Sequence, residues 1–361
     1  VRAGILPLFQ WPPGKIFYII KRKALRMGRK EVRTMKKIWL AAALAAAAVL
    51  GLAGCGGSSE KKADASGKTD IAIVQLMQHG SLDAANQGVV DQLAKRGYTA
   101  DKIEIDQQNA QGDQSNLKNI AARFKNARPD VIVAISTPAA QSVANEIHDI
   151  PIVGVAITDF ETAKLVKSNA KPDTNVTGVN DRGPVEEQVD MGLAFVPGAK
   201  TMGLMYCASE VNSEIQAEQA RRHAASLGLA VEEATVSNVN DIQQAAEAIA
   251  GDVDFIYVPT DNVIASSIPT LVKVTDAAGV PVFVGADSMA RDGALGSISV
   301  DFYKTGIQAG DMAADILEGK GKPETMPVQD PADLTVIINK TNADILGIQI
   351  PDAYKDAVLV D

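Results

Sequence analysis

The sequence predicts an α/β protein of two lobes, each built around a parallel sheet. Short apolar runs alternate with amphipathic segments of helical length, which is the pattern of βαβ units. The alternation starts afresh near residue 185, so a second unit of similar size is expected. A chain of this length buries roughly three quarters of its surface, enough to fold without disulfides.

The first lobe is expected to begin with a buried strand and a helix. Leu82, Ala85, Val89 and Leu93 recur at spacings of three and four, and Gly97 ends the pattern. Strands are predicted at 71–76, 103–105, 131–135, 152–157 and 174–179, with helices from 81, over 113–126 and from 137.

The second lobe and the tail continue the alternation. Strands are predicted at 202–206, 231–236, 255–258 and 282–284, and helices at 185–195, 212–227, 241–250 and 264–278. The tail adds a strand at 298–300, a helix at 303–317 and a last strand at 334–338. We expect residues 70–182 plus 297–327 in lobe one and 183–296 plus 328–361 in lobe two, joined by three crossing segments.

Residues 35–54 have the form of a bacterial secretory signal. A basic start at Met35 precedes an apolar run over 38–50, which is too short to span a bilayer. The run closes with LAGC at 52–55, which resembles a lipoprotein signal in which Cys55 receives lipid. The alternative is an ordinary signal peptide with a chance cysteine. Lipidation predicts attachment to the extracytoplasmic face of a bacterial membrane, with 55–69 as a flexible tether.

Residues 1–34 fit nothing that follows them. They carry nine Lys and Arg and a single Glu, and a signal peptide normally stands at the N-terminus. We interpret them as a spurious upstream extension with Met35 as the initiator; the alternative is a functional basic arm.

Charge excludes nucleic acid as a partner of the exported part. The whole chain has 35 Lys and Arg against 44 Asp and Glu, for a net charge of −9. Residues 1–54 hold 11 of the basic and one of the acidic residues, so 24 basic and 43 acidic residues remain, a net charge of −19. Nucleic-acid binding needs basic surface to neutralise phosphates. Lipid on Cys55 would leave Cys207 without a disulfide partner, as a buried thiol.

Polar residues follow the predicted strands of both lobes. In open parallel sheets, ligands bind beyond the carboxyl ends of the strands. Six polar clusters occur there, at 77–83, 136–141, 158–160, 208–213, 259–262 and 285–288. Each cluster alone is equally well explained as a helix cap. Six on one edge predict a ligand cleft between the lobes.

The chemistry of these clusters favours a zwitterion. Pro138 at a helix start leaves the following amides available to a carboxylate, which the helix dipole also favours. An ammonium group would need an anion, and Asp159, Asp261 and Asp287 are placed to supply it. An amino acid carries both groups.

Five motifs occur in order that together resemble a known family. They are VQL at 74–76 with His79 and LD at 82–83, NAQGD at 109–113, TPAAQ at 137–141, NVTG at 175–178 and YVPTDN at 257–262. Over roughly 70–352 the chain resembles the ABC-transporter substrate-binding proteins of the tryptophan/tyrosine type. The resemblance implies the type I periplasmic-binding-protein fold and ligands that are mostly aromatic amino acids. It places ligand contact on Gln75, His79, Thr137, Ala139, Asp159, Asn212, Asp261, Asn262 and Asp287. The first loop departs from the family, because QHGS stands at 78–81 where EHPA is expected.

An enzyme is the main rival class. The chain has only three His, with no Ser-His-Asp order and no paired Cys/His spacing for a metal. Glycine-rich phosphate loops are also missing after the first strand, so neither a catalytic role nor a cofactor is expected. A DNA-binding regulator is excluded by export and the missing headpiece. The expected partners are a small ligand and ABC permease subunits; the alternative is a receptor that presents its ligand to a membrane sensor kinase.

Overall fold

The computed structural model describes residues 68–361 except Ala332. The extension, the signal peptide and Cys55 lie outside the described residues, and so does most of the tether. Its last predicted residue, Thr69, already belongs to the first strand. No helix within the described part of the chain is long and apolar enough to cross a membrane.

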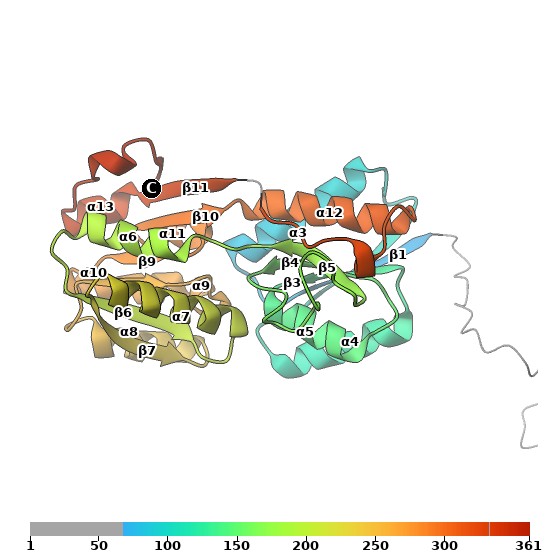
Figure 1. Cartoon of the computed structure of the whole chain (residues 1–361), viewed down its shortest axis with the longest axis horizontal. Coiled ribbons are helices and arrows are strands. Elements are labelled where there is room, and N and C mark those ends of the chain that lie inside the picture. Colours follow the sequence, from blue (N-terminus) through green and yellow to red (C-terminus); the bar gives the residue numbers. More distant parts are fainter. Residues whose placement is uncertain (1–67, 332) are drawn as a thin grey trace, which may run out of the picture. The chain divides into compact units, whose positions relative to one another are not determined.

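The first lobe contains a five-stranded parallel sheet in the order β2-β1-β3-β4-β5 (Figure 1). Its strands are β1 (Thr69–Gln75), β2 (Ile103–Asn109), β3 (Val131–Ile135), β4 (Ile152–Ile157) and β5 (Val176–Asn180). Between them run α3 (Gly80–Lys95), α4 (Gln114–Ala127) and α5 (Thr137–Glu146). Every residue of β3 and β4 is buried, as expected for the central strands of a parallel sheet with both faces covered.

The second lobe contains a seven-stranded sheet in the order β12-β11-β10-β9-β8-β6-β7. Its strands are β6 (Thr201–Cys207), β7 (Ala230–Val236), β8 (Phe255–Val258), β9 (Val282–Val284), β10 (Gly296–Val300), β11 (Leu334–Asn339) and β12 (Val358–Val360). Its helices are α6 (Val185–Phe195), α7 (Val211–Ser226), α8 (Ile242–Ile249), α9 (Asn262–Ala265), α10 (Ile268–Ala278), α11 (Asp287–Arg291) and α13 (Lys340–Leu346). Only β10 and β11 pair antiparallel among its strands.

The chain passes three times between the sheets, which confirms the predicted crossings. It crosses after β5, again between β10 and α12 (Phe302–Leu317), and a third time before β11. The helix α12 returns to the first lobe and lies along α3 (Figure 1). The two helices approach closely because Gly88 and Gly306 have no side chain. A Cβ on Gly306 would lie 2.1 Å from the carbonyl oxygen of Ala85, so this contact excludes larger residues.

The structure differs from the predicted division at one strand. We predicted 297–327 in lobe one, but β10 hydrogen-bonds to β9 and β11 and belongs to the second sheet. The segment after α12 does run along the first lobe. Val328 donates its amide hydrogen to Asn169 O, and Gln329 donates to Gly178 O. The chain therefore leaves the first lobe near Asp330.

Two elements of the second lobe were also predicted imperfectly. The helix expected over 264–278 is two helices, because Ser267 leaves helical geometry (φ −145°, ψ 29°) just before Pro269. The strand at 334–338 is not the last one, since β12 follows and pairs parallel with β11.

Candidate ligand-binding site

A small cavity lies at the carboxyl ends of the strands, where the two lobes meet. Its volume is about 10 Å³, the room of roughly one water molecule. It is lined by His79, Ser81, Leu82, Ala156, Thr158, Asp181, Asn212, Thr260, Asp261, Asn262, Ala265, Ala286 and Phe302. Both lobes and the first crossing segment contribute to this lining, which makes the cavity the candidate site.

Three side-chain hydrogen bonds join the lobes around this cavity. The Nε2 atom of His79 lies 3.1 Å from Asn262 Oδ1, and the Ser81 and Ser288 hydroxyls are 2.7 Å apart. On the other side, Gln216 Nε2 donates to Thr158 Oγ1 at 3.3 Å. The lobes are therefore closed on each other.

Gly80 permits this close approach. A Cβ atom on Gly80 would lie 2.7 Å from Ser288 Cβ in the opposite lobe. The departure from the family pattern at 78–81 thus coincides with a tight contact between the lobes.

A buried carboxylate, Glu210, orients two amides of the second lobe. Its Oε2 accepts hydrogen bonds from Asn212 Nδ2 at 3.0 Å and from Asn262 Nδ2 at 2.6 Å. Because both amide nitrogens are used here, the amide oxygens point elsewhere. Burial, with repulsion from Asp261, raises the pKa of Glu210 to about 7.

His79 lies across from this network in the first lobe. Asn262 Oδ1 is an acceptor, so Nε2 of His79 must carry the hydrogen between them. Burial lowers the pKa of His79, which favours the neutral ring. The Nδ1 atom is then a bare acceptor, and it is buried without a partner.

Asp181 is the first residue of the crossing after β5. It is 4% exposed, and its amide donates to Ile157 O. The carboxyl group accepts from the Thr158 hydroxyl, but its Oδ1 has no partner. Burial raises the pKa of Asp181 to about 6.

Asp261 lines the cavity, yet its carboxylate is bound within the second lobe. It accepts the amides of Cys207 at 2.6 Å and Ile264 at 2.9 Å, the second as the N-cap of α9. It also accepts from the Ser213 hydroxyl and the Val263 amide.

Four of the predicted contact residues line the cavity and five do not. His79, Asn212, Asp261 and Asn262 line it. Gln75 is buried at the end of β1 and bonds to Met77 O, Asp83 and Asn86 within its own lobe. Asp159 pairs with Arg182, and Asp287 with Arg291.

Thr137 and Ala139 are buried in the first turn of α5, away from the cavity lining. The expectation of free amides there needs correction, because Ser136 caps the helix by accepting from the Ala139 amide. Ser136 has φ 99°, a strained value that concentrates at functional sites. The Thr137 hydroxyl has no partner.

Sequence reasoning missed Asp181 and Glu210. Glu210 stood inside a recognised polar cluster but was passed over for Asn212. Asp181 lies two residues beyond the strand predicted at 174–179, and a polar residue after a strand is the signal that found the other clusters, but from the sequence this segment is interpreted only as a crossing between the lobes.

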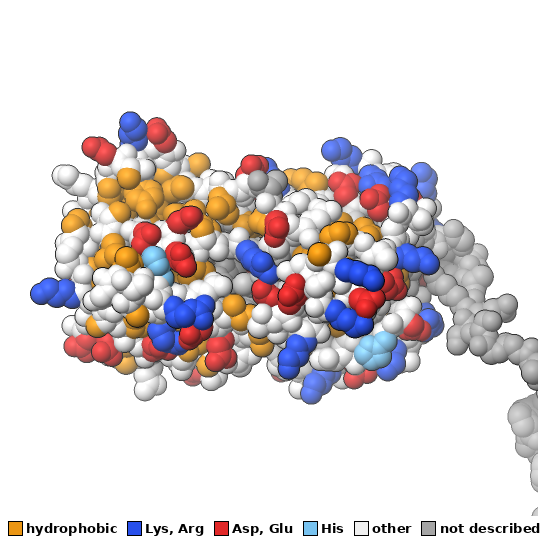
Figure 2. Space-filling model, in the orientation of Figure 1, with side chains coloured by type: hydrophobic (Ala, Val, Ile, Leu, Met, Phe, Trp, Pro, Cys, Tyr) orange, Lys and Arg blue, Asp and Glu red, His pale blue; other side chains and the backbone are white. Residues whose placement is uncertain are grey.

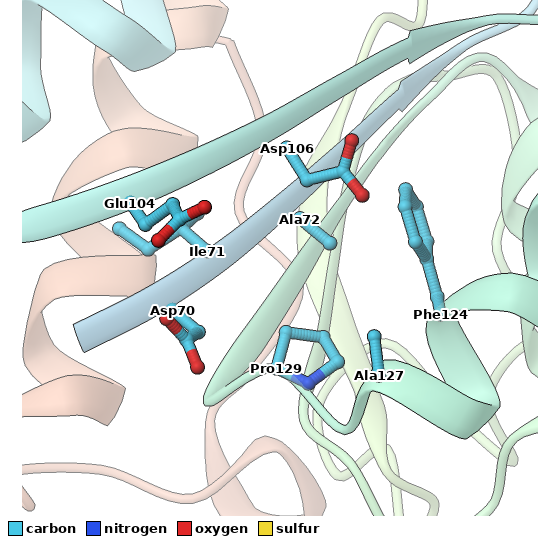
Figure 3. A pocket seen from close by; sticks show the side chains of 8 residues that line it. All are labelled: Asp70, Ile71, Ala72, Glu104, Asp106, Phe124, Ala127 and Pro129. Atoms are coloured by element: carbon cyan, nitrogen blue, oxygen red, sulfur yellow. The ribbon is translucent and has the colours of Figure 1, made fainter. Parts of the chain in front are cut away.

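Larger hollows lie elsewhere on the protein. One of about 350 Å³ is lined by Asp70, Glu104, Asp106 and Phe124, among others (Figure 3). It lies beside the starts of β1 and β2, at the edge of the sheet opposite to the one where ligands bind in parallel folds. Acidic and basic side chains alternate over the face in Figure 2, without a broad basic surface. Within residues 68–361, Ala332 excepted, no three His, Cys, Asp or Glu side chains are grouped to hold a metal ion.

Comparison with known proteins agrees with this geometry. Residues 70–359 match the family described as ABC transporter substrate binding protein. A tyrosine-binding protein of Clostridioides difficile is 37% identical over 81% of this chain and 85% of its own length.

Two solved structures are similar over the same part of the chain. The ABC domain in complex with L-Trp from Streptococcus pneumonia is 38% identical, with a TM-score of 0.79, and covers 81% of this chain and all of its own. The ligand-free, open structure of a substrate-binding protein with adhesive properties from Clostridium difficile is 37% identical. The match covers 81% of this chain and 99% of that protein. Its TM-score is 0.63, so the closed lobes of this chain superpose better on the L-Trp complex.

The buried carboxyl of Asp181 predicts a pH dependence of stability in the ligand-free protein. Its native pKa of about 6 lies above the ordinary value, so its stabilising contribution is present below about pH 4 and is lost as the pH rises through 6. We expect Asp181→Asn to raise the free energy of unfolding at pH 8 by about 1–3 kcal/mol, and by much less at pH 4.5.

Urea unfolding of both chains across this pH range measures the difference. Asp292→Asn, at an exposed position, controls for the substitution itself. Parallel curves for Asp181→Asn and the wild-type protein would contradict the prediction.

Proposed function

Because the chain belongs to the family of ABC transporter substrate-binding proteins, we propose that it captures an aromatic amino acid outside the cytoplasm and passes it to an ABC permease. The observation that carries this proposal is the cavity between the lobes, lined from both sides by buried polar atoms without partners. The relatives support the ligand class, since one is named for tyrosine and another holds L-Trp.

Capture proceeds by closure of the lobes. A cavity of about 10 Å³ is far smaller than an aromatic amino acid, so the ligand has to enter while the lobes are apart. Ligand contacts from both lobes then favour the closed state. The ligand shifts this equilibrium only by the difference between its affinities for the two states.

Phe302 supports the aromatic assignment from the protein side. It opens α12 directly after the second crossing, lines the cavity and is 3% exposed. Aromatic pairs prefer edge-to-face or offset contacts worth about 0.5–1.5 kcal/mol beyond their buried area. An aromatic ligand side chain would gain such a contact here.

We also propose that lipid on Cys55 holds the protein at the membrane, where the permease is. The support is the LAGC sequence at 52–55 after a signal-like apolar run. Mass analysis of the chain purified from membranes tests this, and we expect a mature N-terminus at a lipid-modified Cys55. An unmodified Cys55, or a chain recovered free of the membrane fraction, would refute the anchor.

Calorimetry with the twenty amino acids tests the ligand. We expect L-tyrosine or L-tryptophan to bind at least tenfold more tightly than aliphatic and charged amino acids, since only an aromatic side chain gains the contact with Phe302. Small-angle scattering should show a smaller radius of gyration when the ligand is added. Binding of a sugar or an aliphatic amino acid in preference would contradict the assignment.

Closure itself is tested at Gly80. We expect Gly80→Ala to weaken amino-acid binding by at least tenfold, about 1.4 kcal/mol, because the new methyl group meets Ser288 Cβ only in the closed state. Stability in the absence of ligand should change little.

A second substitution provides the control. Ser288→Gly removes the clashing atom, together with the hydroxyl that meets Ser81, so Gly80→Ala should cause no further loss of affinity in the Ser288→Gly background. A Gly80→Ala protein that binds as the wild type does would show that the ligand-bound lobes stand further apart at this contact.

A further inference from the structure

We propose that Asp181 Oδ1, Asn212 Oδ1 and His79 Nδ1 together form the subsite for the ammonium group of the ligand. This inference rests on the proposed function, because it takes the ligand to be an amino acid. It names the residues by which the site would select an amine, and it moves that role away from Asp261.

The three atoms share a chemical property. Each belongs to a residue that lines the same cavity, and each is buried without a hydrogen-bond partner. All three are acceptors. A buried polar atom left unpaired costs about 1–3 kcal/mol, so a group that satisfies all three would be bound with a large gain.

The acceptor character of the two neutral groups follows from Glu210. The Nδ2 atoms of Asn212 and Asn262 both donate to its carboxyl group, so the oxygen of Asn212, which lines the cavity, points away from Glu210 and has no partner. The oxygen of Asn262 faces His79, which fixes the hydrogen on Nε2 and leaves Nδ1 bare. Neither group can turn a donor toward the ligand without losing a bond to its neighbour.

Asp181 supplies the charge. The pKa of Asp181 is shifted by burial, by the Thr158 hydroxyl and by its own amide. No Lys or Arg side chain within residues 68–361 contributes to the shift. Its neighbour Arg182 is engaged by Asp159 at 2.7 Å. A cationic ligand group would therefore be the partner that this buried carboxylate lacks, and a charge-assisted hydrogen bond is about twice as strong as a neutral one.

An ammonium group fits this set of acceptors in number and in chemical character. It offers up to three N–H donors and no acceptor, one for each of the three atoms. A carboxylate would bring only lone pairs, and a sugar hydroxyl could donate to only one of the three acceptors.

Asp261 lacks the capacity for this role. Its carboxylate already accepts four hydrogen bonds, from the amides of Cys207, Ile264 and Val263 and from the Ser213 hydroxyl. We therefore assign Asp261 to fixing the loop before α9, so that Asn262 is presented correctly.

The experiment measures the coupling between Asp181 and the ligand's amine. The probes are L-tyrosine and L-tryptophan, with their des-amino analogues 3-(4-hydroxyphenyl)propionate and 3-(indol-3-yl)propionate. We expect the wild-type protein to bind the amino acid at least 100-fold more tightly than its analogue. Asp181→Asn should weaken amino-acid binding at least tenfold and change binding of the analogue less than threefold. Asn has the shape of Asp and removes a buried charge, so folding should be retained.

Asp261→Asn is the matched comparison. This substitution should weaken the binding of the amino acid and of its analogue by similar factors, because displacement of the loop before α9 affects both complexes. Equal losses for both probes in Asp181→Asn, or a loss selective for the amine in Asp261→Asn instead, would overturn the inference alone. The inference would also be overturned, without any variant, if the wild-type protein bound the amino acid less than tenfold more tightly than its des-amino analogue. A wild-type protein that binds no amino acid would overturn the proposed function and this inference together.

Discussion

The arrangement of the site depends on the pair of hydrogen bonds that Glu210 accepts from Asn212 and Asn262. The Oε2 atom of Glu210 accepts both bonds, so each amide turns its nitrogen atom toward it. The oxygen of Asn262 then faces the opposite lobe and sets the tautomer of His79, while the oxygen of Asn212 has no partner. One acidic side chain thereby determines the donor and acceptor pattern on both walls of the cavity.

Closed lobes leave unpaired acceptors in a nearly water-sized space, which is unfavourable for the protein by itself. The three unpartnered atoms gain no hydrogen bond within the protein, and the burial that raises the pKa of Asp181 lowers stability near neutral pH. On the proposed assignment, the ligand recovers this free energy when it binds. Because the lobes must be together to bring His79 and Asn212 to one cavity, that gain favours closure as well as binding.

The three crossings place this chemistry at the joint between the lobes. Asp181 begins the first crossing, and Phe302 opens α12 directly after the second, so two lining residues lie in or next to the connecting segments. Close packing of α12 on α3 through Gly88 and Gly306 attaches the returning helix firmly to the first lobe.

The sequence by itself determined the architecture, because hydrophobic period and helix-ending glycines are local signals. It placed the ends of β3, β4, β8 and β9 and of α6 correctly, and it indicated which strand ends carry polar residues. It put β10 in the wrong lobe, since strand pairing is a long-range choice that local pattern does not encode. Only the tertiary structure decided which acids are free. Asp159, Asp261 and Asp287 were all plausible anions in the sequence, but each is already bonded to a residue or amide that folding brings beside it, whereas Asp181 retains an unpaired oxygen.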